Sequence, residues 1–291
     1  MQESLTFVWL EITGKCQLEC RHCYADSGPS GTHGVMRRAD WLRVIDEVAE
    51  LGVRMVQFIG GEPTLHPNLA EFIDLALSHG VEVEVFSNLI HVTADLWDSF
   101  GRSGVHLACS YYSDDPGEHA RITGRVGSHA RTRSDLAEAV RRRIPVRVGV
   151  IDITDGQRTG AAIDELKDIG VTDVGLDRLR QIGRGVRDRK PGVEELCGRC
   201  ASGVLAISPE GDVWPCVFTR WLPVGNVHEA SLAAILTEHR LQQVRYELSE
   251  SFLQRPCVPN MCNPQCGPSC SPACRPASNC QPVGACVPWY R

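Results

Sequence analysis

Six alternations of an apolar strand with an amphipathic helix fill the first 180 residues of the chain. The first pairs a strand over residues 7–13 with a helix over residues 39–52, whose Trp41, Ile45 and Val48 share one face. Right-handed crossovers of this length join parallel strands. The repetition therefore predicts a parallel sheet with helices outside it, either an open doubly wound sheet or an incomplete barrel, with chemistry at the carboxyl ends of the strands. The remaining strands are expected over residues 54–61, 81–88, 105–112, 144–153 and 171–179.

The character of the chain changes near residue 183, where GRGVRDRKPG predicts a linker. Ten of the fourteen cysteines follow, in a stretch with too few aliphatic residues to build its own core. Bound metal is the simplest source of order for such a stretch. We therefore expect a barrel-like core over residues 1–182 and a small Cys-rich domain over residues 183–291.

Charge and hydropathy indicate the compartment and the kinds of partner to expect for this chain. A formal net charge of -6 gives no general attraction to nucleic acid or to an anionic membrane surface. The sequence contains neither a secretory signal nor the roughly 18 apolar residues of a membrane span. We therefore expect a cytoplasmic protein without nucleic-acid or membrane partners, in which clustered thiols hold metal more often than they form disulfides.

Three cysteines, Cys16, Cys20 and Cys23, follow the first predicted strand at spacings of four and three. A structural zinc site requires four ligands, so zinc is an alternative if another residue such as His22 completes the set, and disulfides use thiols in pairs. Three thiolates on one loop can each hold a corner of a cubane iron–sulfur cluster, which normally has four. The fourth iron is then free to bind a small chelating ligand.

This loop resembles the C-x3-C-x2-C signature of the radical S-adenosylmethionine (radical SAM) enzymes. The resemblance implies a partial (β/α)6 TIM-like barrel and a site-differentiated [4Fe-4S] cluster whose open iron binds S-adenosylmethionine. It also implies an electron donor such as flavodoxin or ferredoxin, reductive cleavage of the cofactor to a 5′-deoxyadenosyl radical, and hydrogen abstraction from a substrate C–H bond. His22 occupies the position that the family places near the adenine.

Further motifs match the family at the next strand ends. GGEP, which is Gly60, Gly61, Glu62 and Pro63, follows the second strand, where the family grips the cofactor ammonium: the glycines permit close backbone approach and Glu62 can accept a charge-assisted hydrogen bond. The polar residues that end strands three and four are further candidates for cofactor contact, with helix capping as the alternative: Ser87, Asn88 and Ser110.

The Cys-rich part resembles the SPASM domain, which holds auxiliary iron–sulfur clusters. Cys200 and Cys216 bracket a C-x10-G-x4-C pattern, whose glycine allows a hairpin that returns Cys216 to face Cys200. With Cys197 they predict one auxiliary [4Fe-4S] cluster that needs a further ligand from the tail. A second cluster, a structural zinc or a disordered tail are the alternatives for the remaining cysteines: Cys257, Cys262, Cys266, Cys270, Cys274, Cys280 and Cys286.

Auxiliary clusters in this family imply oxidative modification or crosslinking of a ribosomally made peptide. The rival hypothesis is a small-molecule substrate, such as an aminosugar or nucleoside that is epimerised or dehydrogenated. We expect no N-terminal leader-binding domain because the cluster loop begins at Cys16, and Val217 replaces the Asp of sulfatase-maturing members; both observations favour the rival. A zinc-binding non-enzyme is the alternative of another class, although it leaves the six repeats and GGEP unused.

Two features of the fourth strand bear on the substrate. Cys109 could return hydrogen to a substrate radical, but strand alternation gives it the opposite facing from Ser110, so we interpret it as a core residue. The long polar segment after that strand, residues 110–125, is interpreted as a loop at the active edge. Its candidates for substrate contact are Tyr111, Tyr112, Asp114, Asp115 and His119.

Overall fold

A computed structural model describes residues 4–188 and 190–253 of the chain. Within these residues nine strands form one sheet in the order β6-β5-β4-β3-β2-β1-β7-β8-β9. The first six are parallel: β1 Phe7–Glu11, β2 Met55–Ile59, β3 Glu82–Phe86, β4 Val105–Tyr111, β5 Val146–Asp152 and β6 Asp173–Arg178.

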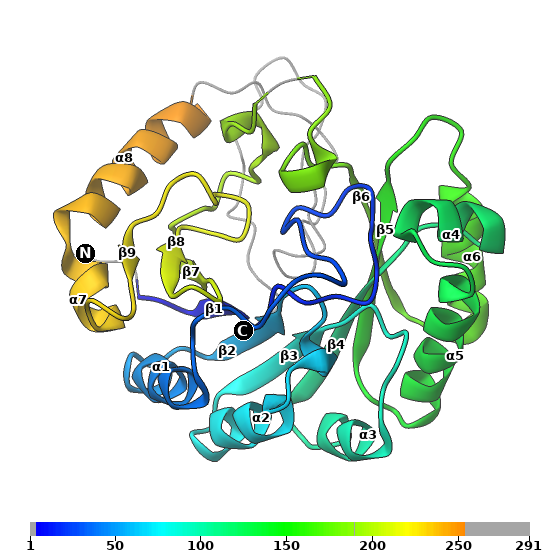
Figure 1. Ribbon diagram of the computed structural model, residues 1–291, viewed down its shortest axis with the longest axis horizontal. Coiled ribbons are helices and arrows are strands. Elements are labelled where there is room, and N and C mark those ends of the chain that lie inside the picture. The colour runs from blue at the N-terminus through cyan, green and yellow to red at the C-terminus, as the bar shows by residue number, and fades with distance from the viewer. Residues whose placement is uncertain (1–3, 189, 254–291) are drawn as a thin grey trace.

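Helices follow these strands and lie along the outer side of the curved sheet (Figure 1). Because β1 to β6 lie side by side in chain order without a reversal, the sheet is singly wound, as in a barrel, and not doubly wound. The predicted α/β fold with an incomplete barrel is confirmed. The helices are α1 Arg38–Glu50, α2 Leu69–Ser78, α3 Ala94–Phe100, α4 Pro116–Thr123, α5 Ser128–Arg141 and α6 Thr159–Ile169.

The Cys-rich part of the chain extends the same sheet. Strand β7, Val204–Ile207, pairs in parallel with β1, and β8, Asp212–Trp214, returns antiparallel to β7. Strand β9, Gly225–Asn226, pairs with β8, and helices α7, Leu232–Thr237, and α8, His239–Leu253, complete the described chain. The proposed boundary between residues 182 and 183 stays a prediction, since β7 joins the edge of the barrel directly.

Two predicted loops have more structure than expected. Residues 110–125 contain α4, which begins after Asp115, whose side chain accepts a hydrogen bond from the Glu118 amide, with Pro116 at the first helical position. The predicted linker contains a short 3-10 helix, Gly183–Gly185, that docks on the loop after β1. In the part of the chain that the structure describes, no helix has the length and apolar character that crossing a bilayer requires.

A buried polar cluster ties three strands of the barrel together. Arg147 on β5 donates two hydrogen bonds of 2.7 Å to the Glu84 carboxylate on β3, and Gln57 on β2 donates a third. The side chains of Arg147 and Glu84 are each 8% exposed. Although burial alone would raise the pKa of Glu84, Arg147 holds it below its usual value.

Replacing Arg147 with Met should destabilise the fold by about 3–5 kcal/mol, because Glu84 is left buried without its counter-charge. Chemical denaturation of the apoprotein measures the effect. Arg141→Met, which removes an arginine from an exposed pair with Glu138, is the control and should change the midpoint little. Equal midpoints for the two variants would contradict the assignment of Arg147 to the core.

Candidate active site

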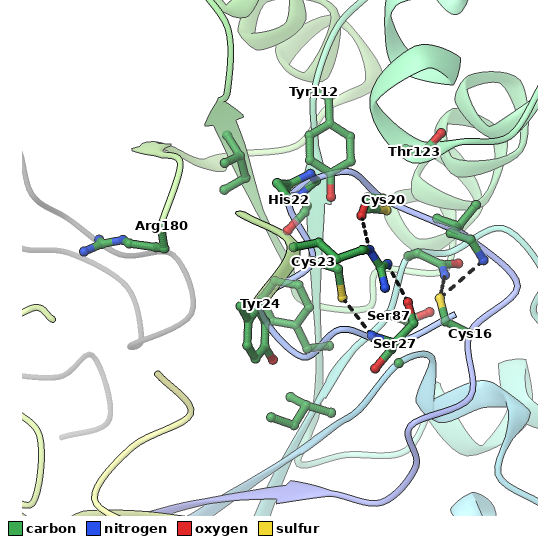
Figure 2. Close-up of a pocket in the computed structure, with 18 of the residues that line it drawn as sticks. Cys16, Cys20, His22, Cys23, Tyr24, Ser27, Ser87, Tyr112, Thr123 and Arg180 are labelled. Atoms are coloured by element: carbon green, nitrogen blue, oxygen red, sulfur yellow. Dashed lines mark hydrogen bonds between the residues drawn. The ribbon is translucent and has the colours of Figure 1, made fainter. Parts of the chain in front are cut away.

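The loop after β1 crosses the mouth of the incomplete barrel and carries the three clustered thiols (Figure 1). Cys16, Cys20 and Cys23 all line one pocket. The pocket opens to solvent, and its volume, with that open space included, is about 1020 Å³. Figure 2 shows them around this pocket, with His22 and Tyr112 beside them. The structure therefore brings the three predicted cluster ligands together at the carboxyl edge of the sheet.

The two glycines of GGEP are required by this loop. The Gly61 amide donates to the Thr13 carbonyl at 2.7 Å, and the Glu62 amide donates to the Lys15 carbonyl at 2.8 Å. A Cβ added at Gly61 would lie 2.4 Å from the Lys15 oxygen, and one at Gly60 would lie 2.4 Å from the Thr13 oxygen. The close backbone approach predicted for these glycines is thus made to the cysteine loop, and both also line the pocket.

Glu62 is fully buried, and its carboxylate accepts hydrogen bonds from the chain itself. The Ser87 hydroxyl donates to Oε1 at 2.7 Å, the Asn88 amide donates to Oε2 at 2.7 Å, and Thr64 donates to Oε1 from its amide and hydroxyl. Burial raises the pKa of Glu62, and these hydrogen bonds oppose the shift. Glu62 and the buried Pro63 do not line the pocket. Through its hydrogen bonds to Ser87 and Asn88, Glu62 joins the end of β2 to the end of β3.

Asn88 connects the end of β3 to the first thiol. Its side-chain amide exchanges two hydrogen bonds with the Gln17 amide, at 3.2 and 3.3 Å, which fixes its orientation. In that orientation its Nδ2 lies 3.7 Å from Cys16 Sγ, which also accepts from the Leu18 amide at 3.4 Å. Ser87 and Asn88 both line the pocket, as the sequence predicted for a cofactor site.

The fourth strand presents Ser110 to the pocket and Cys109 to the core. Cys109 is 1% exposed, which confirms its interpretation as a core residue. Of the substrate candidates on the following segment, Tyr112 and His119 line the pocket. The other three are occupied elsewhere: Tyr111 donates to Glu165, Asp114 pairs with Arg158, and Asp115 caps α4.

The pocket has polar and thiol groups that suit a bound cofactor. Two buried polar atoms among the lining residues, His22 Nδ1 and Ser27 Oγ, have no hydrogen-bond partner in the described structure. Burial, with the nearby Glu62 charge, raises the pKa of Cys16 to about 12, and burial lowers the pKa of His22 to about 4. Binding of iron must therefore displace thiol protons, while His22 stays neutral at pH 7.

Among residues 4–188 and 190–253, no three Cys, His, Asp or Glu side chains converge closely enough to hold a single metal ion. A cubane offers a separate iron to each thiolate, so its ligands need not converge on one point. The thiols, the glycine-lined edge and the unpartnered polar atoms fit an iron–sulfur cluster with a small polar cofactor.

The second group of cysteines forms at the hairpin between β7 and β8. Gly211 has a φ of +85° in the turn, and Cys200 Sγ and Cys216 Sγ lie 3.1 Å apart as free thiols. The predicted hairpin that returns Cys216 to Cys200 is confirmed. Cys197 forms a hydrogen bond with Cys200, and the contacts among the three thiols, with burial, raise the pKa of Cys200 well above its usual value. The seven tail cysteines, Cys257 to Cys286, lie outside the described residues.

Aromatic contact connects the two cysteine groups. Tyr24, next to Cys23, packs edge-to-face on Phe218 with 5.1 Å between ring centroids. The Phe218 amide donates to Cys216 Sγ at 3.4 Å, and both aromatic side chains line the pocket. The first group of thiols therefore lines the pocket directly, and Cys216 of the second group adjoins it through Phe218.

Three arginines on the pocket wall are absent from the sequence-based set. Arg180 extends away from the cysteines in Figure 2 and donates to Asp177 and to the Glu195 carbonyl. Arg178 contacts the Glu194 carbonyl, and Arg184 contacts the cysteine loop. In the sequence Arg178 lies in the last predicted strand, Arg180 directly after it and Arg184 in the predicted linker, and none of them belongs to a motif that marks it.

Comparisons with known proteins agree with this geometry. A model described as the Radical SAM superfamily matches residues 10–167, and one described as an iron-sulfur cluster-binding domain, SPASM, matches residues 197–271. The first covers more than half of the chain, which therefore belongs to the radical SAM superfamily and carries a SPASM domain. S-adenosylmethionine and iron–sulfur clusters are the cofactors of this family.

The chain is similar to enzymes named PqqA peptide cyclase. It is 32% identical over 157 residues to the one from Ruegeria pomeroyi, and 27% identical over 187 residues to the one from Streptomyces rochei. These matches cover 51% and 62% of this chain but only 41% and 50% of the two relatives. Thus the chain spans about half the length of these curated relatives.

Among solved structures, the fold is similar to Streptococcus suis SuiB bound to the precursor peptide SuiA. The TM-score is 0.70 at 12% identity, over 84% of this chain and 66% of that one. At this identity the likeness describes the fold.

Gly61→Ala should lose the iron of the loop cluster, because a Cβ there would press on the Lys15 backbone and displace the loop that carries Cys16, Cys20 and Cys23. Gly160→Ala in α6, where a Cβ meets nothing within 4 Å, is the matched control and should load normally. Iron and sulfide per chain after anaerobic reconstitution are the measurements. Full loading of both variants would show that the backbone contact does not position the thiols.

Proposed function

We propose that this chain is a radical SAM enzyme that oxidatively modifies or crosslinks a ribosomally made peptide. The observation that carries the proposal is a pocket lined by Cys16, Cys20 and Cys23, with Phe218, whose amide bonds to Cys216, in its wall. A C–H bond placed in this pocket would lie beside one site that can hold a redox cofactor and near a second.

In this proposal Cys16, Cys20 and Cys23 hold a site-differentiated [4Fe-4S] cluster, and S-adenosylmethionine binds beside it. When bound and reduced by a flavodoxin- or ferredoxin-type donor in the cytoplasm, this pair supplies the 5′-deoxyadenosyl radical that abstracts hydrogen. The chain contributes the position of the thiols and a pocket that is partly open to solvent. The Asn88 side chain, held by Gln17, donates toward Cys16 and stabilises negative charge on its sulfur.

The remaining pocket edges supply cofactor contacts. Gly60 and Gly61 have no side chain and leave space for the cofactor beside their backbone. Ser87 and Ser110 line the pocket with hydroxyl groups, and His22 Nδ1 is available as a neutral polar atom. Glu62 acts here by ordering the ends of β2 and β3, and any contact that it makes with the cofactor ammonium is an additional role. Ser27 Oγ is a further unpartnered group beside Cys23.

Cys197, Cys200 and Cys216 would hold an auxiliary [4Fe-4S] cluster with a fourth thiol from the tail. Its place beyond Phe218 supports oxidation, because an electron left on the substrate after hydrogen removal needs an acceptor close to the pocket. The number of auxiliary clusters depends on the tail cysteines.

The peptide substrate is supported by the relatives. Those that match in sequence are named for cyclising the peptide PqqA, and SuiB, which shares the fold, was crystallised with a precursor peptide. Tyr112 and His119 are our candidates for contact with the peptide because both line the pocket, where Tyr112 packs edge-to-face on His22 of the cysteine loop.

The reaction can be tested with the anaerobically reconstituted chain, S-adenosylmethionine, dithionite and a library of ribosomally made peptides of about 30 residues. We expect 5′-deoxyadenosine together with peptides that lose two hydrogen atoms, measured by mass spectrometry. Replacing Cys16, Cys20 and Cys23 with alanine should abolish both products. Oxidation of aminosugars or nucleosides, with every peptide unchanged, would instead support the small-molecule rival.

Replacing Cys200 and Cys216 with alanine should separate cofactor cleavage from substrate oxidation. We expect the double variant to lose up to one cluster's iron and to retain 5′-deoxyadenosine formation, while the yield of oxidised product falls at least about tenfold. Cys109→Ala, which removes a buried thiol that belongs to neither group, is the control for loss of a thiol. Unchanged product yield in the double variant would remove the auxiliary site from the reaction.

A further inference from the structure

The segment Gly183–Gly185, at the end of the barrel, lies across the cysteine loop although 157 or more residues separate them in sequence. The Arg184 amide donates to the Cys23 carbonyl at 3.0 Å. Its guanidinium donates from Nε to the Cys20 carbonyl at 3.0 Å and from Nη2 to the Ser27 carbonyl at 2.6 Å. One residue thus holds the loop backbone at three places, two of them on predicted cluster ligands.

A fourth contact completes the set. Arg184 Nη1 pairs with Asp26 Oδ1 at 2.9 Å, and the Arg184 side chain is 31% exposed. The guanidinium is planar and presents five donors in a fixed arrangement, which allows one side chain to bind several acceptors around a curved loop. A lysine ammonium is a compact charge with a different geometry and cannot reproduce this set.

The close approach of this segment depends on Gly183. Its φ is +55°, and a Cβ there would lie 2.5 Å from the carbonyl oxygens of both Cys23 and Tyr24. No larger residue can occupy this position without moving the segment off the loop. The contact therefore depends on backbone shape as well as on the arginine.

Other backbone hydrogen bonds also restrain this part of the loop, among them one from the Arg21 amide to the Ile122 carbonyl at 3.1 Å. The Cys23 amide donates to the Cys20 carbonyl at 3.3 Å, and the Asp26 amide donates to the Cys23 carbonyl at 3.2 Å. Asp26 has a φ of +53°, which is unfavourable for a residue with a side chain. Arg184 binds next to the turns closed by the Cys23 and Asp26 amides. It also lines both the central pocket and a surface hollow formed with Glu19, Arg21 and Arg187.

We propose that Arg184 is a positioning residue for the cluster: it fixes the backbone of Cys20 and Cys23 and places a permanent positive charge beside the cluster. This inference rests on the proposed function. The cluster should resist loss of iron because its ligands are held in place, and its reduced, more negative state should be stabilised by the nearby charge.

The test compares Arg184→Lys, which keeps the charge, with Arg184→Gln, which removes it. Both should lose iron to a chelator about tenfold faster than the parent, because each loses the fixed contacts to the two carbonyls. Only Arg184→Gln should shift the midpoint potential to more negative values, as followed by electron paramagnetic resonance during a redox titration. Both measurements are made in the Cys200→Ala, Cys216→Ala background, which removes the auxiliary site at the hairpin from the signal.

Arg102→Gln, which removes an exposed arginine paired with Asp74, is the matched control and should leave both quantities unchanged. If Arg184→Gln fails to fold, Arg184→Lys and Asp26→Asn decide the question: Asp26→Asn keeps the three carbonyl contacts and should accelerate iron loss less than Arg184→Lys does. Chelator rates and potentials equal to those of the parent in every folded variant would overturn the inference. A parent chain that assembles no iron–sulfur cluster would instead refute the proposed function.

Discussion

The main chain after β1 is bonded to the main chain after β2, and the pocket depends on this contact. In the sheet β1 and β2 pair in register up to Glu11 and Ile59. Beyond the strands the two backbone segments stay hydrogen-bonded. The Gly61 amide donates to the Thr13 carbonyl, and the Glu62 amide donates to the Lys15 carbonyl. The two backbone segments approach so closely that only glycine fits at positions 60 and 61. The start of the cysteine loop is therefore positioned by the sheet.

The Glu62 carboxylate extends this constraint to β3. A buried carboxylate is costly unless hydrogen bonds satisfy its oxygens, so four donors from Thr64, Ser87 and Asn88 must stay in place around it. Asn88 then bonds to Gln17, on the loop where the constraint began. These hydrogen bonds form a closed ring that links the ends of β1, β2 and β3. No residue in the ring can move without breaking one of them, so the site is preorganised.

Much of this was predictable from sequence because local patterns determine it. Strand-helix alternation predicted the six parallel strands, and the spacing from Cys200 through Gly211 to Cys216 predicted the hairpin. Helix α4 was missed although Asp115-Pro116 is a helix-start signal, because the polar composition of the segment was interpreted as a loop. Arg184 could not be found, because its partners lie 157 to 164 residues away and composition alone indicated a solvated linker. Glu62 was recognised, but its bonds to β3 depend on strand order, which spacing does not give.

The arrangement of the two cysteine groups follows from their common neighbour, β1. The cysteine loop leaves its carboxyl end, and β7, which leads into the hairpin, pairs along its free edge from Phe7 to Leu10. At the end of β1 the buried Glu11 binds Arg220 through two hydrogen bonds, of 2.6 and 3.0 Å.

The Arg220 guanidinium in turn lies 4.5 Å from the centre of the Trp214 ring and 6.0 Å from that of Tyr24. Trp214 belongs to the hairpin and Tyr24 to the cysteine loop, so the Glu11–Arg220 ion pair contacts an aromatic ring from each of them. A separation set by contacts to a single buried strand varies less than the separation of two domains joined by a linker. The shared sheet therefore fixes the position of the hairpin relative to the cysteine loop.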